Sequence, residues 1–142
     1  MTSEILQPVA VLAAWSILMW LWMYATRLPA MKRAGMLDAP MVGSVGADIR
    51  GKIDPVAQWK ADNYNHLMEQ PTVFYAVALL LAIAGAGNGF NATLAWVYVG
   101  FRIVHSLVQV TANRVKLRFA LHALGTMPLI ALVTHAVFRV FP

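Results

Sequence analysis

The sequence predicts an all-α integral membrane protein, a bundle of four transmembrane helices formed by residues 1–142 as a single domain. Of its 142 residues, 60% are hydrophobic and only 12% are charged, whereas an ordinary soluble domain has about 25% charged residues. Four apolar stretches also approach the roughly 20 residues that a helix needs to cross a hydrocarbon core about 30 Å thick. They cover residues 6–28, 71–87, 90–111 and 119–141.

The first apolar stretch, residues 6–28, differs from a cleaved signal peptide. It is longer than the apolar region of such a peptide, no basic residue precedes it, and no small-residue cleavage site stands before the polar loop. We therefore expect it to remain in the mature chain as the first transmembrane helix.

The connection to the second helix, residues 29–54, contains several glycines and prolines and has no sustained hydrophobic period, which predicts a surface loop. It ends in Asp54 and Pro55, a good N-cap followed by proline at the first helical position. The second helix should begin near Pro55 and run about four turns below the hydrocarbon before it reaches Pro71.

Basic residues cluster in two of the three connections, while residues 85–92, between the second and third spans, carry no charge. The positive-inside rule therefore places both termini on the non-cytosolic side. The same distribution explains the net charge of +5 by topology and argues against a nucleic-acid partner. The residues are Arg27, Lys32, Arg33, Arg50, Lys52 and Lys60 in the first connection, and Arg114, Lys116 and Arg118 in the last.

Three of the predicted helices carry polar residues at spacings of three or four, which places each set on one helix face. Lipid offers these groups no hydrogen-bond partner. We therefore expect them to meet in a polar cavity that opens toward the cytosol. The stripes are Asp62, Asn65, His66 and Glu69; Tyr98, Arg102, His105, Gln109 and Asn113; and Arg118, His122 and Gly125.

Arg102 lies in the middle of a span, where an arginine costs roughly 2.5 to 17 kcal/mol depending on the method. One explanation is structural: a buried ion pair with Glu69 that clamps two helices. The other is functional. One glutamate cannot neutralise Arg102, Arg114 and Arg118 together, so a small polyanion with carboxylates is the simplest missing partner.

The sequence leaves two interpretations of His105 open: an interhelical hydrogen bond, or a role as a base or ligand in the site. His135 lies off the stripe and is expected to be a structural residue. The four histidines share no zinc-ligand spacing and the chain has no cysteine, so no metal site is expected. Any thiol chemistry must come from the substrate.

Three segments resemble the MAPEG family, the membrane-associated proteins of eicosanoid and glutathione metabolism, in a bacterial-type member. The stretch FRIVHSLVQVTANRVKLR, residues 101–118, is similar to the region of the family's third and fourth helices, with Arg102 and His105 in an Arg-x-x-His pattern. NYNHLMEQPTVFY, residues 63–75, is similar to its second helix. KRAG, residues 32–35, resembles the basic end of its first helix.

The resemblance implies a homotrimer in a bacterial inner membrane that binds glutathione between subunits at the cytosolic side. Arg118 would then be the catalytic residue that stabilises the glutathione thiolate, and a hydrophobic substrate would arrive from the lipid. Glu69 would bind the amino group of the tripeptide. The acidic groups would meet Arg102, His105 and Arg114, and His66, Asn65, Gln109 and His122 would complete the substrate site.

This chain departs from the family at four positions. Asp62 and His66 stand where an arginine and an asparagine are expected, and Gln109 and His122 replace aromatic hydroxyls. Two hypotheses therefore remain: a glutathione-dependent membrane transferase or peroxidase, and a non-catalytic membrane scaffold or lipid-binding partner subunit.

Overall fold

Helices make up most of the computed structural model, which describes every residue except 1, 39, 41 and 142; no strand occurs in this part. Four segments are long and apolar enough to cross a membrane, and α2 and α3 together form one of them. The predicted four-helix membrane fold is confirmed. The elements are α1 (Leu6–Arg33), the 3₁₀ helix η1 (Gly46–Ile49), α2 (Pro55–Leu67), α3 (Gln70–Ile83), α4 (Phe90–Val110) and α5 (Val115–Val140).

The first helix continues through Pro29, so the loop predicted to start there begins five residues later, after Arg33. Lys32 and Arg33 lie in the last turn, where positive charge is favourable beside the negative end of the helix dipole. Gly35 then ends the helix with a φ of 67°, a conformation that suits glycine.

The second span begins as predicted but is broken in its middle. The Asp54 carboxylate accepts a hydrogen bond from the Val56 amide at 3.0 Å, which caps α2. The helix then ends at Leu67 and restarts as α3 at Gln70. Pro71 explains the break, because it has no amide hydrogen and its ring clashes with the carbonyl four residues earlier.

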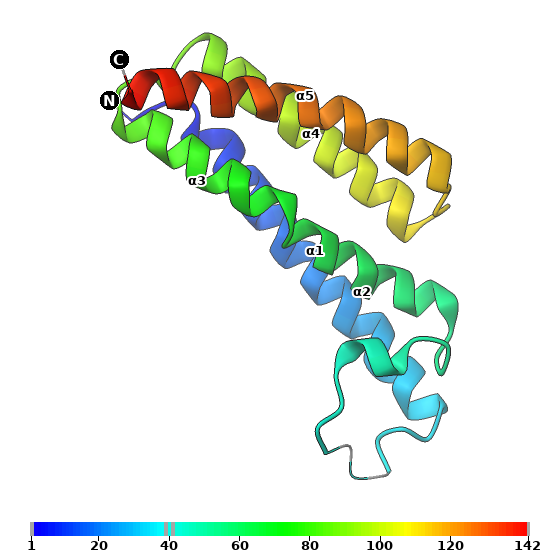
Figure 1. Cartoon of the computed structure of the whole chain (residues 1–142). Helices are drawn as coiled ribbons and strands as arrows, with labels where there is room; N and C mark the ends of the chain where they lie inside the picture. Colours follow the sequence, from blue (N-terminus) through cyan, green and yellow to red (C-terminus); the bar gives the residue numbers. More distant parts are fainter. Residues whose placement is uncertain (1, 39, 41, 142) are drawn as a thin grey trace.

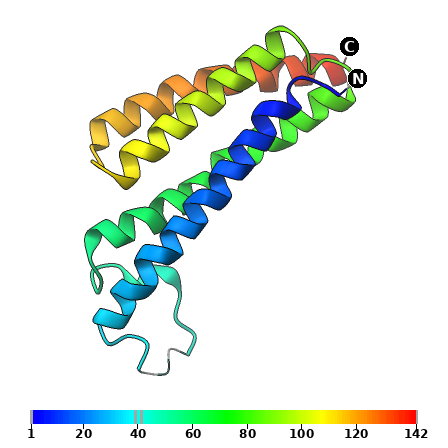
Figure 2. The ribbon, with the colours of Figure 1, turned by 180° about the vertical axis from the view of Figure 1, so that it is seen from behind.

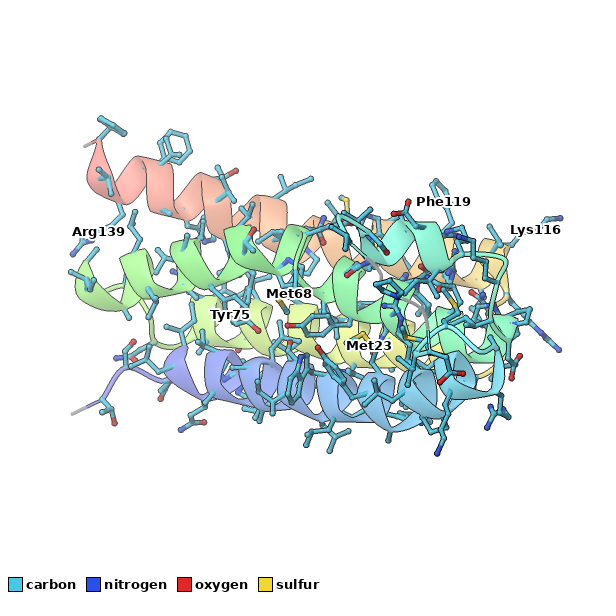
Figure 3. All side chains as sticks on the ribbon, turned by 90° about the horizontal axis from the view of Figure 1, so that it is seen from below. Met23, Met68, Tyr75, Lys116, Phe119 and Arg139 are labelled. Atoms are coloured by element: carbon cyan, nitrogen blue, oxygen red, sulfur yellow. The ribbon has the colours of Figure 1, made fainter. Side chains whose placement is uncertain are left out.

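The helices form two pairs that converge at the end carrying both termini and diverge toward the other end (Figure 1 and, from behind, Figure 2). The closed end is fastened by hydrogen bonds: the Glu4 amide donates to Asn88 Oδ1 at 2.8 Å and Arg139 Nε donates to the Ala84 carbonyl at 3.2 Å. In Figure 3 Arg139 marks this end, and Lys116 and Phe119 mark the opposite one.

A shared core joins the two pairs. The rings of Phe74 on α3 and Tyr98 on α4 stack with centroids 4.6 Å apart, and both side chains are fully buried. Leu12 of α1 and Leu132 of α5 belong to the same cluster. The core therefore joins all four spans.

The packing of α5 on α4 generates a stability prediction. A Cβ added at Gly125 would lie 2.9 Å from Phe101 Cβ, so Gly125→Ala should destabilise the fold by about 1–3 kcal/mol, as overpacking commonly does. We expect a lower thermal unfolding midpoint in detergent. Gly100→Ala is the matched control, since a Cβ there meets nothing within 4 Å; equal midpoints for the two variants would contradict this packing.

Candidate functional site

A cavity of about 470 Å³ lies between α2, α4 and α5 at the end of the molecule remote from the termini. Its volume falls in the range of small-molecule sites, about 300 to 1,000 Å³. Phe119, labelled in Figure 3, belongs to its wall. The full lining is Arg50, Asp62, Asn65, His66, Glu69, His105, Gln109, Val115, Arg118, Phe119 and His122.

Seven of the nine site residues predicted from the sequence line this cavity, and two do not. Arg102 lies beneath the wall and is 1% exposed. Arg114 is an exposed residue that precedes the first turn of α5 and does not line the cavity. The helical spacing thus brings together residues from three elements: Asn65, His66, Glu69, His105, Gln109, Arg118 and His122.

Arg102 is compensated by the end of α2. Its Nη2 donates to the His66 carbonyl at 2.9 Å, and its Nη1 contacts His122 Nδ1 at 3.1 Å. The last four carbonyls of a helix have no intrahelical partner and carry partial negative charge. The break before Pro71 exposes such carbonyls inside the bundle, so a buried cation finds acceptors there without a carboxylate.

The ion pair between Arg102 and Glu69 that we considered from the sequence is not formed. Glu69 Oε2 instead lies 2.9 Å from His66 Nδ1, and the Glu69 side chain is 67% exposed. The physical reason is the helix break, because Glu69 stands between α2 and α3 and not on the regular face of either helix. Its carboxylate therefore faces the cavity and the solvent.

Arg102 also fixes the imidazoles in the cavity wall. A guanidinium only donates hydrogen bonds, so His122 Nδ1 accepts and the ring carries its proton on Nε2. The Glu69 carboxylate only accepts, so His66 carries its proton on Nδ1. These tautomers are assigned from the network. The His66 ring centre lies 4.8 Å from that of His105 and 5.2 Å from that of His122.

Arg118 reaches the cavity from the first turns of α5. Its Nη1 donates to Asn113 Oδ1 at 2.7 Å. Asn113 has a φ of 49°, a left-handed conformation that asparagine tolerates. Arg118 Nε and Gln109 Oε1 are buried and have no hydrogen-bond partner among the described residues. Buried polar atoms rarely lack a partner, so these two mark the cavity wall as incompletely hydrogen-bonded.

Sequence reasoning missed Arg50, which it treated as a topology signal. Arg50 Nη2 lies 2.7 Å from Asp62 Oδ1, and both residues line the cavity. Opposite charge was the only available signal, because no helical period connects a loop residue to α2. His135, as predicted, lies outside the cavity, with Nδ1 2.6 Å from Asn91 Oδ1.

Comparison with known proteins identifies the family. The sequence profile of the MAPEG family matches residues 5–138, nearly the whole chain. No curated protein and no solved structure gave a significant match. The match includes the first three spans, the fourth as far as Phe138, and every residue that lines the cavity. The chain therefore belongs to the MAPEG family.

Proposed function

We propose that the protein is a glutathione-dependent membrane transferase or peroxidase that acts on a hydrophobic electrophile. The observation that carries this proposal is the Arg118 guanidinium in the wall of a polar cavity, where only its Nη1 has a hydrogen-bond partner among the described residues. Family membership supports it, since the MAPEG family includes glutathione-dependent transferases and peroxidases as well as non-catalytic members.

The cavity residues fit the chemistry of glutathione, a tripeptide with one amino group, two carboxylates and one thiol. Glu69 offers an exposed carboxylate for the ammonium group, and the Gln109 side chain lines the same cavity. Arg118 offers a charged donor for a carboxylate or the thiol sulfur. The site thus offers both a cationic donor and an anionic acceptor, and its volume is sufficient for a small peptide.

Arg118 is the proposed catalytic residue. A free thiol with a pKa of about 8.5 is mostly protonated at neutral pH, and an adjacent guanidinium favours the nucleophilic thiolate. Since the chain has no cysteine, the thiol belongs to the substrate. Arg102 lies too deep to touch a ligand and orients His66 and His122 in the wall. Val115 and Phe119 supply an apolar side for a substrate that arrives from the lipid.

A non-catalytic scaffold or lipid-binding subunit is the second candidate. The presence of the Asp62 carboxylate in the cavity favours it, because it offsets the charge of Arg50. Thermal stabilisation of the detergent-solubilised protein separates the two candidates. Stabilisation by glutathione but not by its constituent amino acids supports the enzyme, and indifference to every thiol tested supports the scaffold.

Replacement of Arg118 tests the thiolate role. Loss of one oriented charged donor commonly costs about 10² to 10³ in rate at oxyanion sites, and the point charge of lysine should restore only part of it. We expect the ultraviolet absorbance of glutathione thiolate on mixing with the wild type, a partial signal with Arg118→Lys and none with Arg118→Ala. Arg114→Ala, four residues earlier and outside the cavity, is the control. If the Arg118→Ala protein gives the full signal, the assignment is wrong.

Replacement of Glu69 separates a ligand contact from a structural partner. Its only ion pair among the described residues is a partly exposed contact with His66, and exposed pairs contribute about 0–1 kcal/mol. We expect Glu69→Gln to leave the unfolding midpoint without ligand within a few degrees of the wild type and to abolish stabilisation by glutathione. A large loss of stability without ligand would show that Glu69 holds the fold instead.

We also propose a homotrimer in a bacterial inner membrane, with both termini on the non-cytosolic side and the second span at the trimer centre. Family membership supports this arrangement, because MAPEG members are often trimers. Mass measurement in a mild detergent should give three times the mass of the 15.6 kDa chain. A monomer under these conditions would count against the trimer.

A further inference from the structure

The connection between α1 and α2 brings a basic residue to the cavity from outside the helices. Arg50 directly follows η1, whose Ile49 is buried against Ala30 and Ala57 of the two neighbouring helices. The Arg50 amide also donates to the Ala47 carbonyl at 3.1 Å. The backbone at Arg50 is therefore fixed by packing, although its side chain is 67% exposed.

Asp62 holds the Arg50 guanidinium at one point only. Arg50 Nη2 donates to Asp62 Oδ1 at 2.7 Å, and the same oxygen accepts from Gln58 Nε2 at 3.0 Å, one helical turn away. A guanidinium has five N–H donors in a rigid fork. Arg50 makes no other side-chain hydrogen bond within the described residues. Most of its donors are therefore available to a ligand.

Arg50 and Arg118 approach the same space from different elements. Both line the main cavity, and both line a second cavity of about 310 Å³ that shares Asp62 with it. A simple surface ion pair would contribute about 0–1 kcal/mol to stability and would need no cavity. Two guanidinium groups over one cavity instead match a ligand with more than one acidic group, a carboxylate for Arg50 and the thiolate assigned to Arg118, because a guanidinium fork can bind a carboxylate in bidentate fashion.

We propose that Arg50 binds a carboxylate of the substrate and that Asp62 positions its guanidinium for this contact. The inference rests on the proposed function for the identity of the ligand, glutathione, and names the loop residue that recognises one end of it. Arg118 acts at the other side of the cavity. A carboxylate bound to Arg50 shares the guanidinium with Asp62, so neither anion is left without a cation.

The test is calorimetric titration of the detergent-solubilised full chain with glutathione. Arg50→Ala should weaken binding at least about tenfold, the loss expected for one charge-assisted hydrogen bond. Lys52→Ala is the matched control, since Lys52 has the same charge, lies two residues away and does not line this cavity. Binding to the control should equal that of the wild type.

A double variant that exchanges the charges of Arg50 and Asp62 tests whether lost binding reflects misfolding. Arg50→Asp combined with Asp62→Arg keeps one guanidinium and one carboxylate at the cavity but moves the guanidinium to α2. The double variant should bind better than Arg50→Ala, and its unfolding midpoint without ligand should match that of the wild type. If Arg50→Ala binds as the wild type does, or if Lys52→Ala loses as much, the inference is overturned.

Glutarate, a plain dicarboxylate, separates failure of the inference from failure of the proposed function. If the wild type ignores glutathione but binds glutarate and loses it in Arg50→Ala, the role of Arg50 stands and the glutathione assignment falls. If glutathione binds equally to the wild type and to Arg50→Ala, the glutathione assignment stands and the role of Arg50 falls. If neither compound binds the wild type, both are overturned.

Discussion

The hydrogen bond from Arg102 to the His66 carbonyl is the interaction on which the basic end of the molecule depends. It exists because Pro71 interrupts the second span and leaves helix-terminal carbonyls in the interior. The same guanidinium contacts His122 on α5, so one side chain of α4 links the end of α2 to α5. A continuous second helix would have used these carbonyls in its own backbone and left the arginine without acceptors.

This arrangement divides the basic residues by depth. Both Nη atoms of Arg102 have protein acceptors and the side chain is 1% exposed, whereas Arg118 lines the cavity and, among the residues that the structure describes, donates a hydrogen bond from Nη1 alone. Burial of a cation is costly unless hydrogen bonds satisfy it, and the acceptors from α2 and α5 reduce that cost for Arg102. The imidazoles in the cavity wall above Arg102 therefore have fixed tautomers, and the charged groups that line the cavity remain available to a ligand.

The length of the apolar stretches predicted the spans, the Asp54 N-cap with Pro55 predicted the start of α2, and the helical spacing of polar residues predicted the faces that meet in the cavity. Two features were not predictable. The pairing of Arg102 with Glu69, one of two explanations for the buried arginine, assumed a continuous helix, and the interruption at Pro71 moved Glu69 off that face. The approach of Arg50 to Asp62 depends on how a nonperiodic connection packs through Ile49, which no spacing rule describes.

The fastened end has a practical consequence for building on this scaffold. Both termini lie there, remote from the cavity, and Glu4 anchors the chain by accepting a hydrogen bond from the Gly89 amide at 2.9 Å. A domain or affinity tag appended to either terminus would emerge on the membrane face opposite the cavity and could not block it. An N-terminal fusion only needs a flexible spacer ahead of Ser3, so that the Glu4 carboxylate can still reach the loop.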